Sequence, residues 1–348
     1  MILLFSFIFF PFLLLLWGAG GFQRVKVLPG KIFHPKNAPI LSTPDVLKVL
    51  SWNIGYGQGL GSEGGNLYVK KSEKEFEQIL NQMGTFIAKM QPDIVLLQEV
   101  DLKSHRSHGQ NQLEVFRRFL PQYFAAYGLN WDANYVPFPY WPPSKHFGQV
   151  RAAGVILSRY PIVEHSFSLL PKPEDNPWWY NLFYLFRYYQ KVKIEIGKRT
   201  YSVINTHLEA FDQKGRIGQA KILKHVCEKE VSNHHLLLAG GDLNSIPHYA
   251  LVKEGFTDYP KDRYTKDQTL GLMESIKGLK NSLPESVYRT YEKAYFTFPS
   301  DTPDRRLDHL FVNEKTEVLS VSVLKEAGVL SDHLPIFMEL RLNANQWV

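Results

Sequence analysis

Short, strongly apolar segments that end in polar side chains recur along this sequence. The clearest is HHLLLAGGDLNSIP at residues 234–247, where leucines and an alanine precede two glycines and then Asp242 and Asn244. A short apolar run bounded by glycine and polar residues is typical of a strand that is buried on both faces. Because such strands need apolar layers on either side, this feature limits the chain to architectures with buried sheets.

Strand-like segments outnumber helix-like ones. Apolar residues at helical spacing predict helices over 72–91, 111–120 and 213–231, the first with a capping box formed by Ser72 and Glu75. The strand-like segments are VLKVLSWN, DIVLLQEV, YFAAYGL, RAAGVILSRYPI, KVKIEIG, TYSVINTHLEA, HHLLLAGG, RRLDHLFV, EVLSVSVL and PIFMELRL. This pattern predicts an α/β fold in which mixed β-sheets pack as a sandwich flanked by helices.

Two connections can be assigned in the same way. Lys198 and Arg199 are expected to form the turn between KVKIEIG and TYSVINTHLEA, and residues 131–149, rich in proline and aromatic residues, are expected to form a loop. No phosphate-binding loop of either glycine-rich nucleotide-binding pattern occurs, which argues against a nucleotide-driven machine.

The N-terminal residues MILLFSFIFFPFLLLLW are nearly all apolar. We expect residues 1–22 to be a signal peptide or a single membrane anchor, 23–45 a proline-containing linker, and 46–343 one catalytic domain. A retained anchor would leave the domain on the cytoplasmic side, because basic residues follow the apolar run, whereas a cleaved signal would export it. The sequence therefore predicts either membrane association or export.

Composition excludes several kinds of site. The single cysteine, Cys227, excludes an intrachain disulfide and a thiolate metal cluster, and it is expected to be a small apolar residue on a helix. The net charge of +6 comes from scattered lysines and arginines. This charge is compatible with an anionic partner but does not choose between nucleic acid and phospholipid.

Polar side chains stand at the margins of several apolar strands. Each one alone is explained by capping, exposure or core hydrogen bonding, but a group of them at one sheet edge would bury mutually repelling charges at a cost of several kcal/mol each. Such a group calls for a cation and an anionic ligand to balance it. The residues concerned are Asn53, Glu99, His207, Asp242, Asn244, Asp308, Asp332 and His333.

An ordered set of motifs over about residues 46–343 resembles the endonuclease/exonuclease/phosphatase (DNase I-like) superfamily. The motifs are LSWNIG, DIVLLQEVD, GVILSRYPI, NTHLE, GGDLNSIP, RRLDHLFV and LSDHLPI. The resemblance implies a four-layer fold of two packed sheets between helices. It also implies metal-dependent phosphoester hydrolysis, with nucleases, inositol-polyphosphate phosphatases and neutral sphingomyelinases among the related activities.

The resemblance also implies a cation and its ligands. Glu99 would be the main metal ligand, with Asn53 and Asp332 close to the ion. Oxygen ligands without a cysteine cluster suit a hard cation, so we expect Mg²⁺, with Mn²⁺ as a possible substitute.

The remaining side chains would carry out the hydrolysis. Asp242 would accept a proton from the attacking water, and Asn244 would point to the same side of an extended backbone. His333, held by Asp308, would donate to the phosphoryl oxygen. By resemblance, His207 would contact the phosphate or the leaving oxygen.

The strand-end residues do not specify the substrate, so its selection must come from the loops. Aromatic stretches at 131–147 and 178–189, the second containing Arg187, have the composition of a lipid interface and favour a lipid headgroup phosphodiester or phosphomonoester. The same aromatics could instead form core or an edge strand. They could also stack bases, which keeps an Mg²⁺-dependent nuclease as the alternative. A catalytically inactive binding module is a third reading, and no obligate protein partner is evident.

Overall fold

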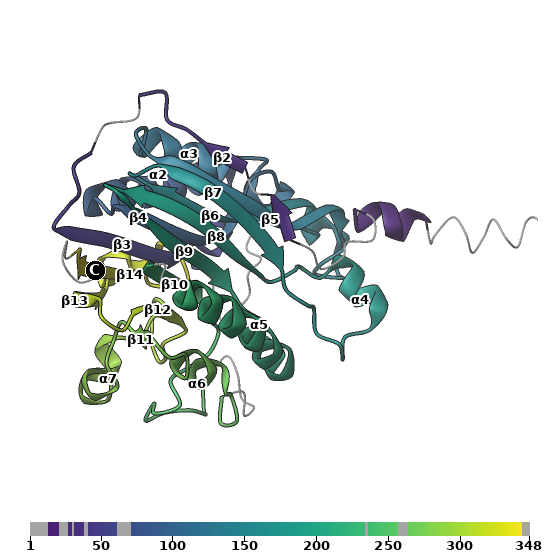
Figure 1. Ribbon diagram of the computed structural model, residues 1–348. Coiled ribbons are helices and arrows are strands. Elements are labelled where there is room, and N and C mark those ends of the chain that lie inside the picture. Colours follow the sequence, from purple (N-terminus) through teal and green to yellow (C-terminus); the bar gives the residue numbers. More distant parts are fainter. Residues whose placement is uncertain are drawn as a thin grey trace, which may run out of the picture.

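Two mixed sheets face each other in the computed structural model, which describes residues 13–20, 27–29, 31–37, 41–60, 71–233, 236–256 and 264–342 (Figure 1). The first sheet has the order β1 (Val27–Pro29), β7 (Ile162–Leu169), β8 (Tyr188–Ile196), β9 (Arg199–His207), β10 (Leu236–Asp242), β12 (Asp308–Asn313) and β11 (Leu279–Asn281). The second has the order β13 (Glu317–Val323), β14 (Ile336–Arg341), β3 (Val46–Asn53), β4 (Ile94–Asp101), β6 (Gly148–Ser158), β5 (Phe124–Val136) and β2 (Lys31–Phe33).

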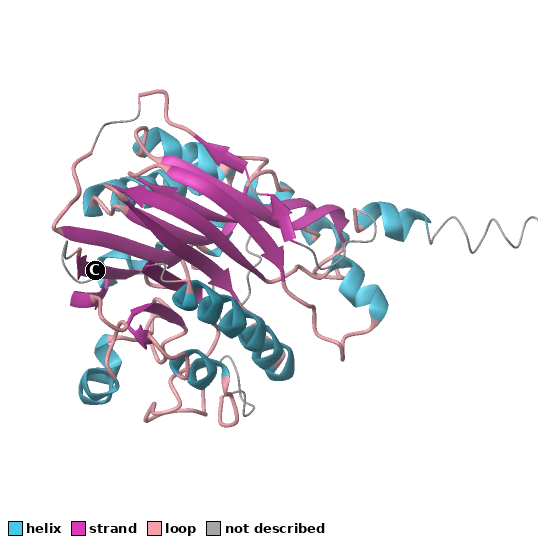
Figure 2. Ribbon diagram, viewed as in Figure 1, coloured by secondary structure: helices cyan, strands magenta, loops and turns pink. Residues whose placement is uncertain are grey.

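Helices cover the outer face of each sheet, which confirms the predicted sandwich (Figure 2). The helices are α2 (Glu73–Met90), α3 (Gln112–Phe119), α4 (Trp178–Phe183), α5 (Gln213–Ser232), α6 (Thr269–Glu274) and α7 (Glu285–Tyr291). The capping box predicted at the start of α2 is present, with Ser72 and Glu75 each bonded to the backbone of the other. It satisfies backbone N–H groups that the first turn leaves without helical partners.

Alternation along the strands explains why they are apolar throughout. Val49 and Leu238 point into the layer between the sheets, whereas Leu50 packs against α2 and Leu237 against α5 and α6. Cys227 is buried in α5 on the same side as Leu237, as expected of a small apolar residue. With apolar layers on both faces, β3 and β10 form rigid supports for the side chains at their ends.

A close fit between β9 and β10 depends on glycine. Gly241 has φ +135°, and a Cβ atom built there would lie 2.1 Å from the carbonyl oxygen of Thr206 in β9. The glycine pair of the sequence therefore lets β10 approach its parallel neighbour immediately before Asp242.

Three local expectations are wrong. Residues 131–136 of the expected loop continue β5, because Trp131 and Ala133 pack on Phe147 and Val150 in an apolar cluster. The turn between β8 and β9 is formed by Gly197, with φ +63°, and Lys198, so that Arg199 already belongs to β9. Part of the expected linker 23–45 is sheet, because β1 pairs with β7 and β2 with β5.

The N-terminal prediction falls mostly outside the described residues, which begin at residue 13 and omit 21–26. Residues 13–18 are helical. Among the residues that the structure describes, no helix has the length and apolar character needed to cross a bilayer.

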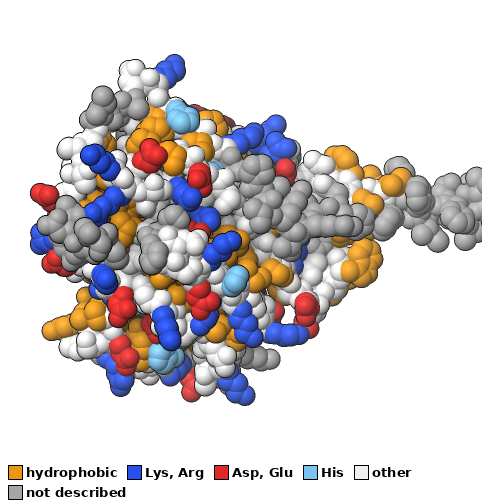
Figure 3. Space-filling model, in the orientation of Figure 1, with side chains coloured by type: hydrophobic (Ala, Val, Ile, Leu, Met, Phe, Trp, Pro, Cys, Tyr) orange, Lys and Arg blue, Asp and Glu red, His pale blue; other side chains and the backbone are white. Residues whose placement is uncertain are grey.

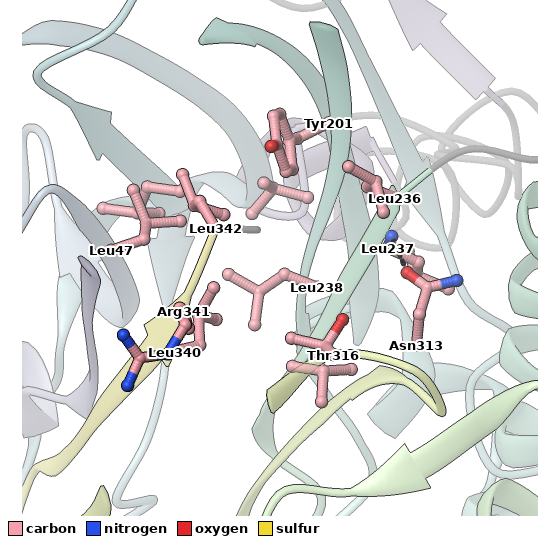
Figure 4. A pocket seen from close by; sticks show the side chains of 13 residues that line it. Leu47, Tyr201, Leu236, Leu237, Leu238, Asn313, Thr316, Leu340, Arg341 and Leu342 are labelled. Carbon is pink, nitrogen blue, oxygen red and sulfur yellow. Dashed lines mark hydrogen bonds between the residues drawn. The ribbon is translucent and has the colours of Figure 1, made fainter. Parts of the chain in front are cut away.

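A cavity of ≈ 30 Å³ lies between the sheets, lined by leucines from β3, β10 and the end of β14 (Figure 4). It contacts Leu236, Leu237 and Leu238, at the opposite end of β10 from Asp242. With room for about one or two water molecules, it is a packing gap rather than a substrate site.

Candidate active site

Three polar side chains of the first sheet stand side by side. Asp242, the last residue of β10, is paired in register with His207 of β9 and with Asp308 of β12. Residues paired across neighbouring strands place their side chains on the same face of the sheet, about 5 Å apart. Sheet register alone therefore brings together residues that are distant in the sequence.

The second sheet contributes from the same edge of the sandwich. β3 and β4 are parallel and carry Asn53 and Glu99 at or near their C-terminal ends, while β14 runs antiparallel to β3 and begins just after Asp332 and His333. The indole N–H of Trp52 in β3 donates to the carbonyl oxygen of His333 at 2.8 Å. The segment before β14 is thereby held against the end of β3.

A bulge in β4 turns Glu99 out of the regular sheet. The pairing of β4 with β6 shifts between Leu97 and Val100, and Glu99 has φ +57°. A bulge of this kind re-aims a side chain, and a left-handed conformation at a non-glycine residue costs on the order of 1–3 kcal/mol. Asn244 and Tyr56 share this conformation, with φ +48° and +54°. Three of the five non-glycine residues with positive φ in the described part of the chain thus lie around one site.

His333 and Asp308 form a buried hydrogen-bonded pair. Nδ1 of His333 lies 2.9 Å from Oδ2 of Asp308, as the predicted orienting contact requires. Burial by itself lowers the pKa of His333, but the carboxylates of Asp308 and then Asp242 outweigh it and raise the pKa to about 10. The imidazole is therefore protonated at neutral pH, with Nε2 directed 3.7 Å from Asp242 Oδ2.

Asp242 lies at the centre of the group and is 1% exposed. Its Oδ2 accepts from Asn53 Nδ2 at 2.9 Å, and its Oδ1 accepts from the backbone N–H of Asn244 at 2.8 Å. Burial is the largest influence on its pKa, which is raised to about 6, while the charge of His333 opposes the rise. A carboxylate with this pKa accepts protons better than an exposed aspartate and is still ionised near neutral pH.

Asn244 differs from expectation. The expectation of an extended backbone after Asp242 is wrong, because φ at Asn244 is +48° and β10 ends at Asp242. The side-chain Nδ2 of Asn244 donates to the carbonyl oxygen of Leu208 at 3.0 Å. A tight turn stabilised by the Asp242 carboxylate replaces the extended arrangement, and it still keeps Asn244 beside the site.

His207 has a partner that sequence reasoning missed as a site residue. Arg187 lies before β8, is buried, and places a guanidinium nitrogen 2.5 Å from His207 Nε2. Because guanidinium only donates, Nε2 accepts, and burial followed by the charge of Arg187 holds the pKa of His207 well below its usual value. Nε2 also lies 3.4 Å from Asp242 Oδ2, but it has no proton to share with that carboxylate.

Arg187 is held in turn by an acid and a phenol. Its Nε lies 3.6 Å from Glu209 Oε2, and the Tyr184 hydroxyl donates to Glu209 Oε1 at 2.6 Å. The aromatic stretch that contains Arg187 therefore does not present this arginine to a lipid surface. The sequence did not reveal this role, because Arg187 stands among aromatic residues and becomes a neighbour of His207 only when β8 pairs with β9.

A second arginine, Arg106, packs on Tyr56 near Glu99. Arg106 makes a two-nitrogen ion pair with Asp101, and its guanidinium lies 3.5 Å from the ring centre of Tyr56. The charge of Glu99 is among the causes that raise the pKa of Tyr56. Tyr56 is therefore close to Glu99, and neither Tyr56 nor Arg106 was singled out from the sequence.

Glu99, Asn53 and Asp332 form an oxygen-rich corner. Asn53 Oδ1 accepts from the Gly55 N–H at 3.0 Å, and Asp332 Oδ1 lies 2.8 Å from where a Cβ on Gly55 would stand. Burial and then the Asp332 carboxylate raise the pKa of Glu99 to about 7. Two carboxylates beside a carboxamide are a donor set suited to a hard divalent cation.

A second set of ligand-type atoms overlaps the hydrogen-bonded centre. Single atoms of Asp242, Asp308 and His333 lie within 4.8 Å of one another. The Nδ1 of His333 is already committed to Asp308, so proton transfer suits these three residues better than cation binding.

Other basic and imidazole side chains of the molecule have structural partners. Arg151 is ion-paired with Asp132 at 2.9 Å on the surface. His108 bonds to the carbonyl of Lys71, and His309 is buried against the carbonyl of Ser245. All eight predicted site residues gather at one edge of the sandwich.

Comparison with known proteins identifies the family. The model of the endonuclease/exonuclease/phosphatase family matches residues 50–333, a range that contains all eight predicted site residues. The chain belongs to the endonuclease/exonuclease/phosphatase family. Membership places it among the hydrolases of phosphoesters, a family that generally uses a divalent cation. A search of curated protein sequences finds no match.

Solved structures of the endonuclease/exonuclease/phosphatase fold resemble the chain at low identity. One is a family protein from Beutenbergia cavernae, 21% identical over 86% of this chain and 72% of that one, with a TM-score of 0.60. Another is a mannosyl-6-phosphatase from Bacteroides thetaiotaomicron, 20% identical over 85% of this chain and 100% of that one, with a TM-score of 0.56. A third is D. rerio TDP2 complexed with a single-strand DNA product, 14% identical over 86% of this chain and 100% of that one, with a TM-score of 0.55. These likenesses establish the shared fold.

Proposed function

We propose that this protein is an Mg²⁺-dependent phosphoester hydrolase in which Asp242 activates the attacking water. The observation that carries the proposal is the position of Asp242. It is buried between the protonated imidazole of His333, which is hydrogen-bonded to Asp308, and the oxygen-rich corner of Glu99. A base beside both a proton donor and a cation site is the arrangement that phosphoester hydrolysis requires.

Glu99, Asn53 and Asp332 would hold the cation. When bound, Mg²⁺ would neutralise negative charge on the phosphoryl group and lower the pKa of nearby water, and Mn²⁺ would substitute. Asn53 Oδ1 now accepts from the Gly55 N–H, and a carbonyl oxygen has a second lone pair available for the ion.

The protein's own groups would manage the protons. Asp242 Oδ2 would accept the proton of the water, while the hydrogen bond from Asn53 Nδ2 holds that oxygen in place. His333 would donate from Nε2 to the phosphoryl oxygen as its negative charge increases. The hydrogen bond to Asp308 keeps the ring turned and charged for this purpose.

His207 and Arg187 would bind the phosphate. An arginine buried at the site supplies a permanent positive charge and several donors that suit phosphate oxygens. By accepting from Arg187, His207 Nε2 fixes which way the guanidinium faces, and Nδ1 carries the imidazole proton. Asn244 would add a carboxamide beside the base.

Among phosphoesters, we propose a lipid headgroup ester, hydrolysed at a membrane to which residues 1–22 attach the domain. The support is the uncharged N-terminal sequence together with the aromatic composition of 131–147 and 178–189. Export after cleavage of the segment is the alternative location. A nuclease is the second candidate, because Phe211, exposed next to Glu209, offers a ring on which a base could stack.

A panel of substrates tests both the hydrolase proposal and the lipid-headgroup proposal. Sphingomyelin and phosphoinositides in vesicles, bis(p-nitrophenyl) phosphate, p-nitrophenyl phosphate, plasmid DNA and abasic DNA would be assayed with Mg²⁺ or EDTA. We expect Mg²⁺-dependent turnover that Asp242→Asn abolishes, with the vesicle lipids preferred. Turnover that survives Asp242→Asn would refute the assigned base, and cleavage of DNA without lipid turnover would reverse the order of substrates.

If the protein hydrolyses none of these substrates, it would instead be a catalytically inactive binding module. In that case the variant and the wild type would show equal rates at the level of the uncatalysed reaction on every substrate. Binding of Mg²⁺, measured by calorimetry, would then distinguish an intact site without the right substrate from a site that no longer holds the ion.

A further inference from the structure

Four large aromatic side chains form an exposed surface at one end of the molecule. Tyr140 and Trp141 come from the segment between β5 and β6, and Trp178 and Trp179 come from α4. Trp141 is 81% exposed and Trp178 62%. We call these four residues the aromatic shelf. Exposed tryptophans grouped in this way are uncommon on soluble surfaces and mark contact sites.

The shelf is continuous across its two segments and firmly attached. The rings of Tyr140 and Trp179 lie 6.5 Å apart in an edge-to-face arrangement. The indole N–H of Trp131 donates to the carbonyl oxygen of Phe183 at 2.9 Å, which ties the end of α4 to β5. Since α4 has no fully buried residue, its tryptophans are not needed to complete the core.

The N-terminal apolar sequence reaches the molecule beside the shelf. Asn134 Nδ2 in β5 donates to the carbonyl oxygen of Trp17 at 2.8 Å, and a Cβ on Gly18 would lie 3.3 Å from Phe183 of α4. Figure 1 shows the N-terminal helix and α4 next to each other, and Figure 3 shows hydrophobic surface at the same end. Leu14 and Trp17 of that helix are themselves exposed.

Charge is sparse in the segments that carry the shelf. Residues 1–23 contain no Asp, Glu, Lys or Arg, and the segments 135–147 and 176–186 contain only Lys145. Before α4 lie Lys172, which donates to the carbonyl oxygen of Asn181, and Glu174 and Asp175, which are ion-paired with Lys214. Tryptophan and tyrosine combine an apolar ring with a polar N–H or O–H, so they are suited to the boundary between lipid headgroups and acyl chains. An uncharged aromatic surface joined to a long apolar sequence fits a lipid bilayer better than it fits a polar protein partner.

Ring contacts lead from the shelf to the proposed phosphate-binding group. Trp179 lies 6.1 Å from Tyr180, and Tyr180 stacks on Tyr184 at 5.4 Å. The Tyr184 hydroxyl bonds to Glu209, whose other carboxylate oxygen lies 3.6 Å from Arg187. A continuous series of side-chain contacts thus connects the shelf with the candidate active site.

We propose that the aromatic shelf is a docking surface for a lipid bilayer and that it places the active-site edge of the sandwich next to the headgroups. The proposal rests on the membrane association given above and is independent of which phosphoester is hydrolysed. It assigns to Trp141 and Trp178 insertion into the interface, beyond the tethering provided by the N-terminal segment.

Fluorescence quenching tests the shelf without any need for turnover. The full-length chain would be reconstituted with dioleoylphosphatidylcholine vesicles that contain dibrominated phosphatidylcholine, which quenches tryptophan emission on contact. We compare the wild type with Trp141→Ser/Trp178→Ser. Tyr291→Ser in α7 is the matched control, because Tyr291 is an exposed aromatic residue outside the shelf, at 63% exposure.

We expect the double variant to lose more than half of the quenching at an unchanged melting temperature, while the control matches the wild type. Its KM for a vesicle-borne substrate should rise about tenfold per tryptophan, because each withdrawn ring forfeits roughly half of its burial energy. Hydrolysis of a soluble phosphodiester should stay within twofold. The quenching should persist in 1 M NaCl, since the shelf has almost no charge.

Other results would refute the docking proposal. Equal quenching of the double variant and the wild type, or no quenching of the wild type, would show that these rings do not enter the lipid. A shelf-dependent dimer in sedimentation would assign the surface to a second copy of the chain. Shelf-dependent quenching without phosphoester turnover would instead retain the docking surface and refute the proposed hydrolase function.

Discussion

Replacing Gly241 by alanine should displace Asp242 from the active site without changing any polar group. A Cβ at this position would lie 2.1 Å from the Thr206 carbonyl oxygen, against the 3.4–4 Å of ordinary contact. The atom met is backbone and cannot rotate away, so β9 and β10 must separate by roughly 1 Å. Because Asp242 is the next residue, it moves relative to its partner His207.

The magnitude follows from two costs. Overpacking in a well-packed interior costs about 1–3 kcal/mol, and a backbone at φ +135° costs an L-residue a further 1–3 kcal/mol or so. We expect a loss of about 2–6 kcal/mol of unfolding free energy, or about 3–8 °C in melting temperature for a chain of this size. A displacement of about 1 Å at a catalytic group lowers kcat/KM by about a hundredfold.

Thermal unfolding and steady-state hydrolysis of bis(p-nitrophenyl) phosphate would measure both effects. Gly218→Ala is the matched control, because a Cβ at Gly218 in α5 meets nothing within 4 Å. That exposed helical alanine should stabilise the protein by about 0.5–1 kcal/mol and leave activity unchanged. If Gly241→Ala keeps its melting temperature within 1 °C and its activity within threefold, the close approach of β9 and β10 is not what positions Asp242.

Three further predictions concern the cation site, acid stability and the thiol. Glu99→Gln should lower activity at least a hundredfold or so and abolish the rise in melting temperature that Mg²⁺ produces over EDTA, because the main ligand charge is lost; a normal Mg²⁺ shift would contradict the ligand assignment. Burial lowers the pKa of His165 to about 4, so the unfolded chain binds its proton first as pH falls below about 6.5. The free energy of unfolding should therefore decline between pH 6.5 and 4, and in His165→Gln this decline should be smaller by about 1–2 kcal/mol. Equal declines of the wild type and the variant in denaturant titrations would exclude His165 as the cause. Cys227 is buried and its thiol pKa is raised, so a chromogenic disulfide reagent should label it only after unfolding, and labelling of the native protein would refute its burial.

Local patterns predicted most of the secondary structure. The capping box of α2, the helical spacing of α5 and the apolar runs of β3 and β10 are properties of neighbouring residues, so they can be read without the fold. The same reasoning failed at Trp131, where proline and aromatic content suggested a loop. There the strand forms because Trp131 and Ala133 pack on Phe147, a tertiary contact that local composition does not encode.

For the candidate site, the residue types could be predicted but not their contacts. Three residues stood out because each is a polar side chain at the end of an apolar strand-like segment, namely Asp242, Glu99 and His333. Arg187 did not, since an arginine among aromatics looks like a surface residue until β8 is placed beside β9. Only the pairing of these strands shows that its guanidinium is buried against His207.

The sequence by itself determined the α/β class, the order of the motifs and the set of oxygen and imidazole groups available for chemistry. Tertiary structure decided which of these groups meet. It set the register of Asp242 between His207 and Asp308, and it turned Glu99 out of β4 through a bulge. The physical reason is range: hydrogen-bond register and burial arise between strands far apart along the chain, whereas sequence patterns report on neighbours.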